Sequence, residues 1–482
     1  MMRRVRFLPA VALTALLAAC AGNLAEPRLA PVTSSDMGLG GETAPAIPAA
    51  WWTDMGDAQL DRIMSDALES SPDLSMAMAR LDAARATLDM RRSDGRPQVD
   101  VDGDEQRTRL SEHYIIPPPY GGSTQWMGQI QANLSWTLDF WGKQATAVRQ
   151  ASASAKAAAL DADAARLALT GAVAQTYVEL VRAERIIAVT RTRIAERQNA
   201  LQLTNARVRA RLASQLDAEA VRTELSRAEQ ELVRAQSQRS LAVHALAALA
   251  GRGVDYYDTI GPATLNLDSA LPVPTVLPAD LLARRPDIAA ALARIEAARQ
   301  GRELARKAYY PDINLAGLVG VQALGLDKLF TGGAVTYGGG AAIHLPIFNG
   351  GRLRAEHGRA TADLDTAIAD YNGQVVRAVR DAADALTSVS SSADDLTAQR
   401  NITHGLSETR RLNRIRMNSG LDSRLDIVAS ELRLLEAEVA TANLEAESVL
   451  ARIRLLVALG GDFPTSAPAS SSNPPERKSD NG

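Results

Sequence analysis

The feature that most constrains the fold is an internal duplication, because motifs from the first half of the chain recur in the same order in the second half. Three pairs of matching segments are separated by 214 positions: Ser71-Pro72-Asp73 with Arg285-Pro286-Asp287, Leu81–Arg85 with Ile295–Arg299, and Pro97 with Pro311. Three later pairs are separated by 209 positions: Gly142-Lys143 with Gly351-Arg352, Leu216-Asp217 with Leu425-Asp426, and Gly251 with Gly460. A repeat with constant spacing predicts two tandem copies of one structural unit.

The two spacings differ by five residues, so the first copy carries an insertion between Pro97 and Gly142. Within this interval, the segment Glu112–Gln125 contains three consecutive prolines and two consecutive glycines, which favour turns and loops. The sequence therefore predicts a longer loop in the first copy.

Each copy is predicted to contain a helix, two strands and two long helices, in this order. The clearest strand is Trp126–Leu138, where apolar or small residues alternate with polar ones and define one apolar and one polar face. The segments 335–347 and 313–321 alternate in the same way in the second copy. A fourth strand is predicted from Val99 onward, although its sequence becomes charged at Glu105.

Trp126 and Trp136 lie on the apolar face of this strand, ten residues apart. At about 3.3 Å per residue and a tilt of roughly 40°, they bracket about 25 Å, the height of a lipid-facing band between two aromatic girdles. A half-buried strand in a soluble sheet is the alternative, but the opposite face is polar throughout. Four strands cannot close a barrel, and lipid does not tolerate an open edge. A membrane-spanning sheet would therefore need several chains, and three chains give a twelve-stranded β-barrel.

The long helices are predicted from apolar and small residues that recur every three or four positions, which is the pattern of coiled-coil seams. One such seam comprises Leu364, Ile368, Tyr371, Val375, Ala378, Ala382 and Ala385. The segment from Lys143 to about Asn205 is predicted to form one helix of about 90 Å. Nothing that long is needed to bury a globular core, so the predicted fold class is mainly α with a small transmembrane β part.

The N-terminal residues have the organisation of a secretory signal peptide. Arg3, Arg4 and Arg6 precede a short apolar stretch that ends in Leu17-Ala18-Ala19-Cys20. This end resembles a lipobox, so residues 1–19 are predicted to be a signal peptide and Cys20 to be the lipidated N-terminus of the mature chain. A chance cysteine after an ordinary signal peptide is the alternative. No run of about eighteen apolar residues follows, so no membrane-spanning helix is predicted.

The composition argues against catalysis and against nucleic acid as a partner. The formal net charge of -3 offers no basic surface. The five histidines, at positions 113, 244, 344, 357 and 404, are scattered without metal-ligand spacing, and the single cysteine is assigned to lipid. Glycines 338–340 lie inside a predicted strand, so they are interpreted as strand packing and not as a phosphate loop. No catalytic, metal or cofactor residues are therefore predicted, apart from the covalent lipid.

Three segments of the second copy resemble signature segments of the outer-membrane factors, the TolC-like superfamily: Ala283–Ile288, Tyr310–Leu315 and Leu345–Arg352. The lipobox is similar to that of its lipoprotein (NodT-type) branch. This resemblance implies a homotrimer with a twelve-stranded β-barrel in the outer membrane and a long periplasmic α-helical barrel. It also implies a periplasmic adaptor, an inner-membrane transporter of the resistance-nodulation-division (RND) type, and a role as exit duct of a tripartite efflux system that exports small molecules or drugs.

In that family, the turns between the paired long helices form the periplasmic tips, which here correspond to Leu212–Asp217 and Ser419–Asp426. In relatives, a leucine, a carboxylate and an arginine after the second turn close the periplasmic entrance. Leu425 keeps the leucine, so it is expected to line the constriction. Ala429 and Leu432 stand where the carboxylate and the arginine would be, which argues against an ionic gate of the usual kind.

Three charged residues near this turn are candidates to replace the missing pair at the periplasmic entrance: Asp422, Asp426 and Arg433. The alternative interpretation is that they are exposed charges of an ordinary helix turn.

The predicted segments are a lipidated extended N-terminal segment (20–50), a first repeat (51–252), an inter-repeat segment (253–280), a second repeat (281–463) and a disordered tail (464–482). Two other functions remain open at this point. One is the outer-membrane duct of type I protein secretion, and the other is a non-conducting coiled-coil lipoprotein of the cell envelope.

Overall fold

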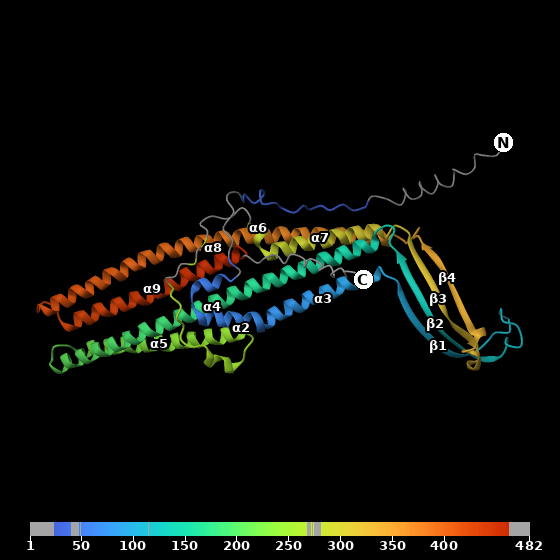
Figure 1. Cartoon of the computed structure of the whole chain (residues 1–482). Helices are drawn as coiled ribbons and strands as arrows, with labels where there is room; N and C mark the ends of the chain where they lie inside the picture. Colours follow the sequence, from blue (N-terminus) through green and yellow to red (C-terminus); the bar gives the residue numbers. More distant parts are fainter. Residues whose placement is uncertain are drawn as a thin grey trace, which may run out of the picture. The chain divides into compact units, whose positions relative to one another are not determined.

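The chain contains two copies of one order of elements, each a helix, two strands and two long helices (Figure 1). The first copy comprises α3 (Pro72–Asp94), β1 (Gln98–Arg109), β2 (Thr124–Leu138), α4 (Lys143–Arg209) and α5 (Gln215–Leu249). The second copy comprises α7 (Pro286–Lys307), β3 (Asp312–Leu324), β4 (Val335–His344), α8 (Arg352–Asn418) and α9 (Arg424–Ala458). The predicted duplication and the mainly helical fold class with four strands are thereby confirmed.

The other elements of this computed structural model are short. They are the 3-10 helices η1 (Trp51–Met55), η2 (Val254–Thr259), η3 (Leu326–Lys328) and η4 (Gly332–Ala334), together with α2 (Ala58–Ser70) before the first copy and α6 (Leu281–Arg284) before the second. The structure describes residues 24–39, 48, 50–113, 115–267, 271, 273 and 281–461. Cys20, the predicted signal peptide and the predicted C-terminal tail lie outside the described residues.

The chain divides into two compact units. Unit 1 contains the residues up to Pro31, Leu81–Ala158 and Ala291–Tyr371, and it therefore holds all four strands and the helix ends next to them. Unit 2 contains Val32–Arg80, Ala159–Ala290 and the residues from Asn372 onward, and it therefore holds most of each long helix.

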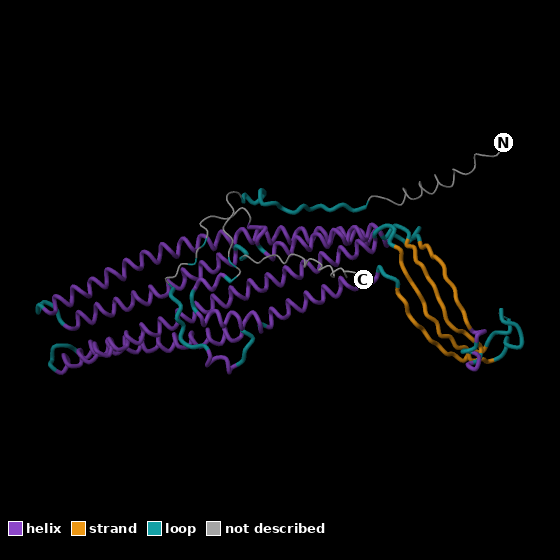
Figure 2. The backbone as a smooth tube through the Cα atoms, viewed as in Figure 1, coloured by secondary structure: helices purple, strands orange, loops and turns teal. Residues whose placement is uncertain are grey.

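The strands of unit 1 form one antiparallel sheet in the order β1-β2-β3-β4 (Figure 2). All four predicted strands are present, including the charged part of β1. β4 ends at His344 and not at Ile347 as predicted, because Pro346 has no N–H group to donate to a neighbouring strand. The loop between β1 and β2 covers residues 110–123 and the loop between β3 and β4 covers residues 325–334, so the longer loop lies in the first copy as predicted.

The long helix that was predicted to run from Lys143 to about Asn205 is α4, which extends to Arg209. α4 and α8 contain 67 residues each, and α5 and α9 contain 35 residues each. A helix of 67 residues is about 100 Å long. All members of the predicted α8 seam, from Leu364 to Ala385, are buried, which confirms that this face packs against other helices. In the part of the chain that the structure describes, no helix is long and apolar enough to cross a membrane.

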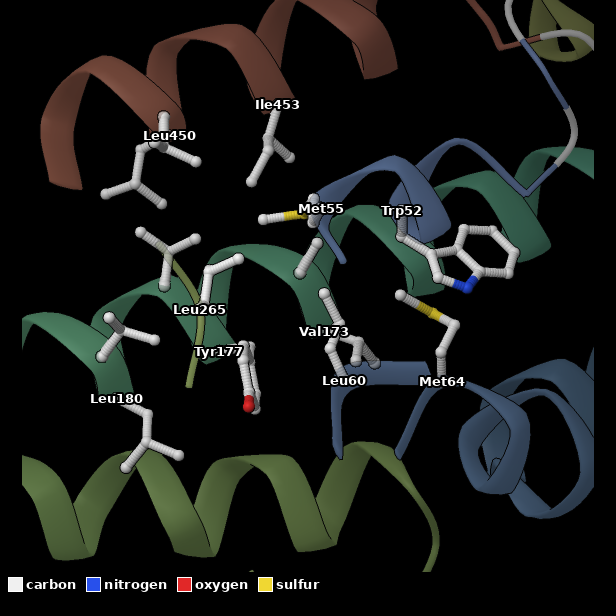
Figure 3. Close-up of a cluster of buried hydrophobic side chains, with 14 of the residues drawn as sticks. Trp52, Met55, Leu60, Met64, Val173, Tyr177, Leu180, Leu265, Leu450 and Ile453 are labelled. Carbon is white, nitrogen blue, oxygen red and sulfur yellow. The ribbon is translucent and has the colours of Figure 1, made fainter. Parts of the chain in front are cut away.

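The hydrophobic core of unit 2 lies where η1 and α2 pack against α4 and α9 (Figure 3). Trp52 and Met64 from the N-terminal elements lie among Tyr177 of α4 and Ile453 of α9, and all four side chains are buried. The Tyr177 hydroxyl accepts a hydrogen bond from Gln59 Nε2 (3.2 Å), so its polar end is satisfied inside the core. This core fixes the elements that precede the first copy to the long helices.

Asp57 caps the N-terminus of α2 and connects it to the inter-repeat segment. Its carboxylate accepts hydrogen bonds from the backbone N–H groups of Gln59 (2.8 Å) and Leu60 (3.3 Å), and from the N–H and hydroxyl of Thr264 (3.0 and 3.1 Å). Burial raises the pKa of the Asp57 carboxyl, but hydrogen bonds from the Tyr177 hydroxyl and from these groups outweigh burial and lower the pKa below its ordinary value.

Each copy ends at a glycine with a left-handed backbone that approaches the carbonyl group two residues before the first helix of the same copy. These glycines are Gly251 (φ +65°) and Gly460 (φ +96°). A Cβ added to Gly251 would lie 2.2 Å from the Ser70 carbonyl oxygen, and a Cβ added to Gly460 would lie 2.9 Å from the Arg284 carbonyl oxygen. Neither position has room for a side chain, so glycine is required twice at the same place in the repeat.

Candidate functional site

The sheet of unit 1 has one apolar face, which the register of the strands defines. Its apolar side chains are Val99 and Val101 of β1, Trp126, Ile130, Leu134 and Trp136 of β2, Ile313, Leu315, Val319 and Val321 of β3, and Val335, Tyr337 and Ile343 of β4. The same face also carries the charged residues Glu105, Arg107 and Arg109 at the end of β1 next to the β1–β2 loop. Several of these side chains are largely exposed, for example Val101 (71%) and Tyr337 (82%). An exposed apolar patch that extends over all four strands marks a surface that a membrane or another protein covers.

The opposite face of the sheet is mainly polar. It carries Asp100, Asp102 and Asp104 of β1, Gln129, Gln131 and Asn133 of β2, and Asn314 and Gln322 of β3. Asn133 Nδ2 donates a hydrogen bond to Asp102 Oδ2 (2.8 Å) across the first two strands. The sheet thus presents a largely apolar face and a mainly polar face.

Both edges of the sheet are available for pairing. β1 and β4 are the first and last strands in the sheet order, and each pairs on one side only within the described residues. The backbone N–H and C=O groups on their outer sides can therefore pair with strands of another chain.

Trp126 and Trp136, the predicted aromatic girdle, both lie on the apolar face, with exposed fractions of 44% and 37%. The Arg107 guanidinium lies 5.7 Å from the centroid of the Trp126 ring. Trp136 Nε1 donates a hydrogen bond to the Gly95 carbonyl oxygen (3.1 Å). Each ring combines apolar surface with a polar contact, as aromatic residues at membrane interfaces do. Their role as a girdle stays a prediction.

A second group of exposed aromatic residues, which was not predicted from the sequence, lies at the helix side of the sheet. Phe140 (66% exposed) and Trp141 (47%) follow β2, and Phe348 (91%) follows β4. Trp141 stacks on Tyr310, which precedes β3, with ring centroids 5.4 Å apart. The signal in the sequence was the position of each aromatic residue just outside a predicted strand.

The turns between the long helices have the same backbone conformation in both copies. Arg211 (φ +59°) in the first turn and Gly420 (φ +72°) in the second both adopt the left-handed conformation, 209 positions apart. The next residues, Leu212 and Leu421, are exposed by 69% and 68%. Each turn therefore presents an exposed leucine directly after its left-handed residue.

Two of the predicted entrance residues build the second turn. The Asp426 carboxylate accepts hydrogen bonds from the Ser423 hydroxyl (2.6 Å) and N–H (2.9 Å), which lower its pKa. Together with the hydrogen bond from the Asp426 N–H to the Ser423 hydroxyl (3.4 Å), the bond from the Ser423 N–H forms the capping box of α9. The Asp422 carboxylate accepts two hydrogen bonds from the Arg416 guanidinium (2.8 and 3.0 Å). Both carboxylates are thus engaged within their own turn.

Leu425 is half-buried in the first turn of α9, next to Asp422 and Asp426. Arg433 is exposed on the same helix, about 12 Å further along, and forms no ion pair within the part of the chain that the structure describes. The structure therefore places Leu425 and the two carboxylates together and Arg433 apart from them. Their role at the entrance stays a prediction.

A buried carboxylate that the sequence analysis missed connects three long helices of unit 2. Glu445 of α9 is 4% exposed, and its two oxygens lie 3.3 Å from Arg185 of α4 and 3.7 Å from Arg400 of α8. Two heptads earlier on α9, Glu431 pairs with Arg410 of α8 (3.0 Å). The heptad spacing of the two glutamates was the signal that could have revealed them.

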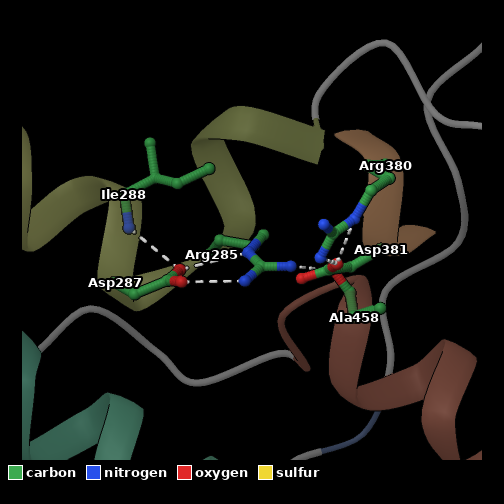
Figure 4. Close-up of polar contacts among 6 residues, drawn as sticks. All are labelled: Arg285, Asp287, Ile288, Arg380, Asp381 and Ala458. Atoms are coloured by element: carbon green, nitrogen blue, oxygen red, sulfur yellow. Dashed lines mark hydrogen bonds and ion pairs between the residues drawn. The ribbon is translucent and has the colours of Figure 1, made fainter. Parts of the chain in front are cut away.

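Arg285, in one of the signature segments, links the start of α7 to the end of α9 (Figure 4). Its guanidinium donates two hydrogen bonds to the Asp287 carboxylate (3.1 and 2.8 Å) and one to the Ala458 carbonyl oxygen (2.9 Å). Burial raises the pKa of Asp287, but its contacts with Arg285 lower the pKa below the ordinary value. A cation at the C-terminus of α9 also interacts favourably with the helix dipole.

Within the described residues, no group of three or more histidine, cysteine, aspartate or glutamate side chains is arranged to hold a metal ion. The lipidation of Cys20 stays a prediction, because that residue lies outside the described part.

Known proteins with similar sequence or structure add four findings. The model of the family described as "Outer membrane efflux protein" matches residues 63–252 and 277–461. The chain is 33% identical over 323 residues to the fusaric acid resistance protein FusA of Burkholderia cepacia, covering 66% of this chain and 61% of that relative. It is 29% identical to the multidrug resistance outer membrane protein MdtQ of Escherichia coli O157:H7, covering 96% of this chain and all of MdtQ. The crystal structure of the outer membrane protein VceC from Vibrio cholerae superimposes with a TM-score of 0.78 at 31% identity, covering 87% of this chain and all of VceC.

Proposed function

Because the chain belongs to the outer membrane efflux protein family, a family of non-enzymatic channels, we propose that it is an outer-membrane efflux channel and the exit duct of a tripartite pump. It exports small molecules or drugs, in keeping with the names of its relatives FusA and MdtQ. It acts as a homotrimer, with a periplasmic adaptor and an inner-membrane transporter of the RND type as partners.

The two-faced sheet is the observation that carries this proposal. Its apolar face is exposed in the single chain, its other face is polar, and both of its edges can accept a further strand. Three chains supply twelve strands, and pairing of β1 in one chain with β4 of the next closes the sheet. The apolar face then contacts lipid and the polar face lines a water-filled passage. A non-conducting tether would have no use for such a sheet.

The proposed ends of the duct follow from the chain order. The lipid on Cys20 anchors the mature N-terminus in the outer membrane, and residues 20–50 connect it to the first repeat (51–252). The inter-repeat segment (253–280) and the second repeat (281–463) follow. The helix turns form the periplasmic entrance, where the exposed Leu212 and Leu421 offer apolar contacts to an adaptor.

Leu425 lines the narrowest part of this entrance, while Asp422 and Asp426 hold the shape of the turn that carries it and Arg433 adds charge beyond it. A Leu425→Ala channel in planar bilayers should leak more in the closed state. An unchanged leak would refute the assignment of Leu425.

The function itself is tested by purifying the lipidated protein in detergent, measuring its mass, and recording single-channel conductance in planar bilayers. The expected results are a trimer and ohmic conducting steps, together with restored drug resistance in cells that lack their own outer-membrane channel. A monomer in detergent with no conductance would refute the proposal.

A further inference from the structure

A segment close to the N-terminus, residues 25–29, is bound to the helices of unit 1 through its backbone. The Asp365 carboxylate of α8 accepts hydrogen bonds from the N–H groups of both Arg28 (2.9 Å) and Leu29 (3.2 Å) through one oxygen, Oδ1. Hydrogen bonds to a charged acceptor are stronger than those between neutral groups. Because backbone groups are bound, this contact fixes the path of the chain.

A second contact lies closer to the N-terminus. The Ala25 carbonyl oxygen accepts a hydrogen bond from the Arg302 guanidinium of α7 (3.0 Å). It also lies 3.3 Å from the Thr361 hydroxyl of α8, which shares its single hydrogen between Ala25 and the His357 carbonyl oxygen (2.9 Å). The same guanidinium pairs with the Glu26 carboxylate (2.7 Å). Arg302 and Thr361 also contact each other (3.3 Å), so the two helices present one joint binding surface to the segment.

The order of these contacts gives the direction of the segment. Leu29 is bound at Asp365 and Ala25 is bound at Thr361, one turn closer to the start of α8. Towards lower residue numbers, the chain therefore heads for the beginning of α8, where the strands of unit 1 end. Pro27, between the two contacts, has no N–H group to satisfy and favours an extended backbone.

We propose that Arg302, Thr361 and Asp365 are positioning residues that hold the lipid-bearing N-terminus at the level where α8 begins. This inference rests on the proposed lipidation of Cys20.

The stretch of chain between Cys20 and Ala25 is just long enough to reach the start of α8. Thr361 lies nine residues from the first residue of α8, which corresponds to about 14 Å along the helix. Cys20 precedes Ala25 by five residues, which can span at most about 17 Å. The tether reaches the helix–strand junction with little to spare, and exposed Phe348 lies at that junction. The bound segment thus acts as a short, directed anchor, whereas an unbound one could place the lipid over a far wider area.

Trypsin offers a direct test, because Arg28 is the only lysine or arginine among residues 20–50. Cleavage of the Arg28–Leu29 bond releases the lipopeptide Cys20–Arg28, which mass spectrometry identifies. Proteolysis requires local release of the segment from Asp365. In the intact trimer in detergent, Asp365→Ala should release the lipopeptide on the order of tenfold faster than wild type, because two charge-assisted hydrogen bonds are lost.

Two variants separate positioning from a general loss of structure. Asp365→Asn keeps an acceptor oxygen and should restore most of the protection. Asp363→Ala removes an exposed carboxylate of the same helix that pairs only weakly with Arg359 (3.9 Å), and it should be cleaved like wild type. Equal cleavage of wild type and Asp365→Ala, or release of a peptide without lipid, would overturn the inference.

The match in length is tested by deleting Gly22–Leu24, which shortens the reach from Cys20 to Ala25 to about 7 Å. In lipid vesicles the shortened tether cannot satisfy both the membrane and the binding surface, so cleavage at Arg28 should be on the order of tenfold faster than in detergent. Wild type should be equally protected in both. If the lipidated deletion variant is equally protected from trypsin in vesicles and in detergent, the length match is refuted. Normal trimers and normal conductance of this variant would leave the proposed function intact.

Discussion

Because the two faces of the sheet differ in polarity, an arginine should have different effects on membrane insertion at two neighbouring positions of β2. Ile130 lies on the apolar face, opposite Val321, and Gln131 lies on the polar face, opposite Asp102. Ile130→Arg should prevent stable insertion of the trimer, whereas Gln131→Arg should be tolerated. The two variants introduce the same side chain into the same strand, so they differ only in the face that receives the charge.

The free-energy cost of Ile130→Arg depends on how deep Ile130 lies in the membrane. Ile130 is four residues from Trp126 and six from Trp136, which places it near the middle of the proposed lipid-facing band. An arginine facing lipid at the midplane costs about 2–4 kcal/mol, so three copies cost about 6–12 kcal/mol per trimer. That penalty is comparable with the entire stability of a typical domain, about 5–15 kcal/mol. On the polar face the arginine stays hydrated, and the carboxylate of Asp102 lies across from it.

The measurement is the fraction of protein that inserts into lipid vesicles as trimer, followed by resistance of the trimer to dissociation in detergent. Far-ultraviolet circular dichroism should show normal helices in both variants, which separates failed insertion from failed folding. If Ile130→Arg inserts as well as Gln131→Arg, the apolar face does not contact lipid and the reasoning is wrong.

Three further predictions concern stability, measured by thermal unfolding of the purified protein. Gly251→Ala should lower the free energy of unfolding by at least about 3 kcal/mol, because the added Cβ would lie 2.2 Å from the Ser70 carbonyl oxygen. The control variant Gly332→Ala, at a position with open space around it, should leave the stability unchanged. Arg285→Ala should cost about 2 kcal/mol through loss of its hydrogen bonds to a carboxylate and a helix end, and a loss below about 0.5 kcal/mol would contradict this. Because the fold lowers the pKa of Asp57, its carboxylate stabilises the protein above about pH 4, and this stabilisation is lost as the pH falls further. The Asp57→Asn variant should therefore be less stable than wild type at pH 7. Its stability should also fall less when the pH is lowered.

Much of the fold could be predicted because it is encoded by local periodicity. The alternation in Trp126–Leu138 specifies a strand and both of its faces, and the seam from Leu364 to Ala385 specifies a packed helix. The duplication then turned the strand pattern into a statement about two places in the chain, whereas the seam pattern is not in phase between the copies.

The rest depends on contacts between residues far apart in sequence. Glu445 was missed because a glutamate within a helix is ordinarily exposed, and only the arrival of arginines from two other helices makes its burial possible. The contact of Arg285 with Ala458 requires α7 and α9 to meet, which no local pattern reveals. For the same reason, the motif around Asp422 and Asp426 indicated charge near the entrance but not that both carboxylates are engaged within the turn.

The two glycines that close the repeats explain how the halves can share a fold while sharing few side chains. At Gly251 and Gly460 the constraint is steric exclusion by a facing carbonyl, which any larger residue violates irrespective of its chemistry. Elsewhere the two copies carry different residues at equivalent positions, as at Arg211 and Gly420, which share the left-handed conformation. The two copies therefore resemble each other through steric constraints at a few closely packed positions more than through a shared composition.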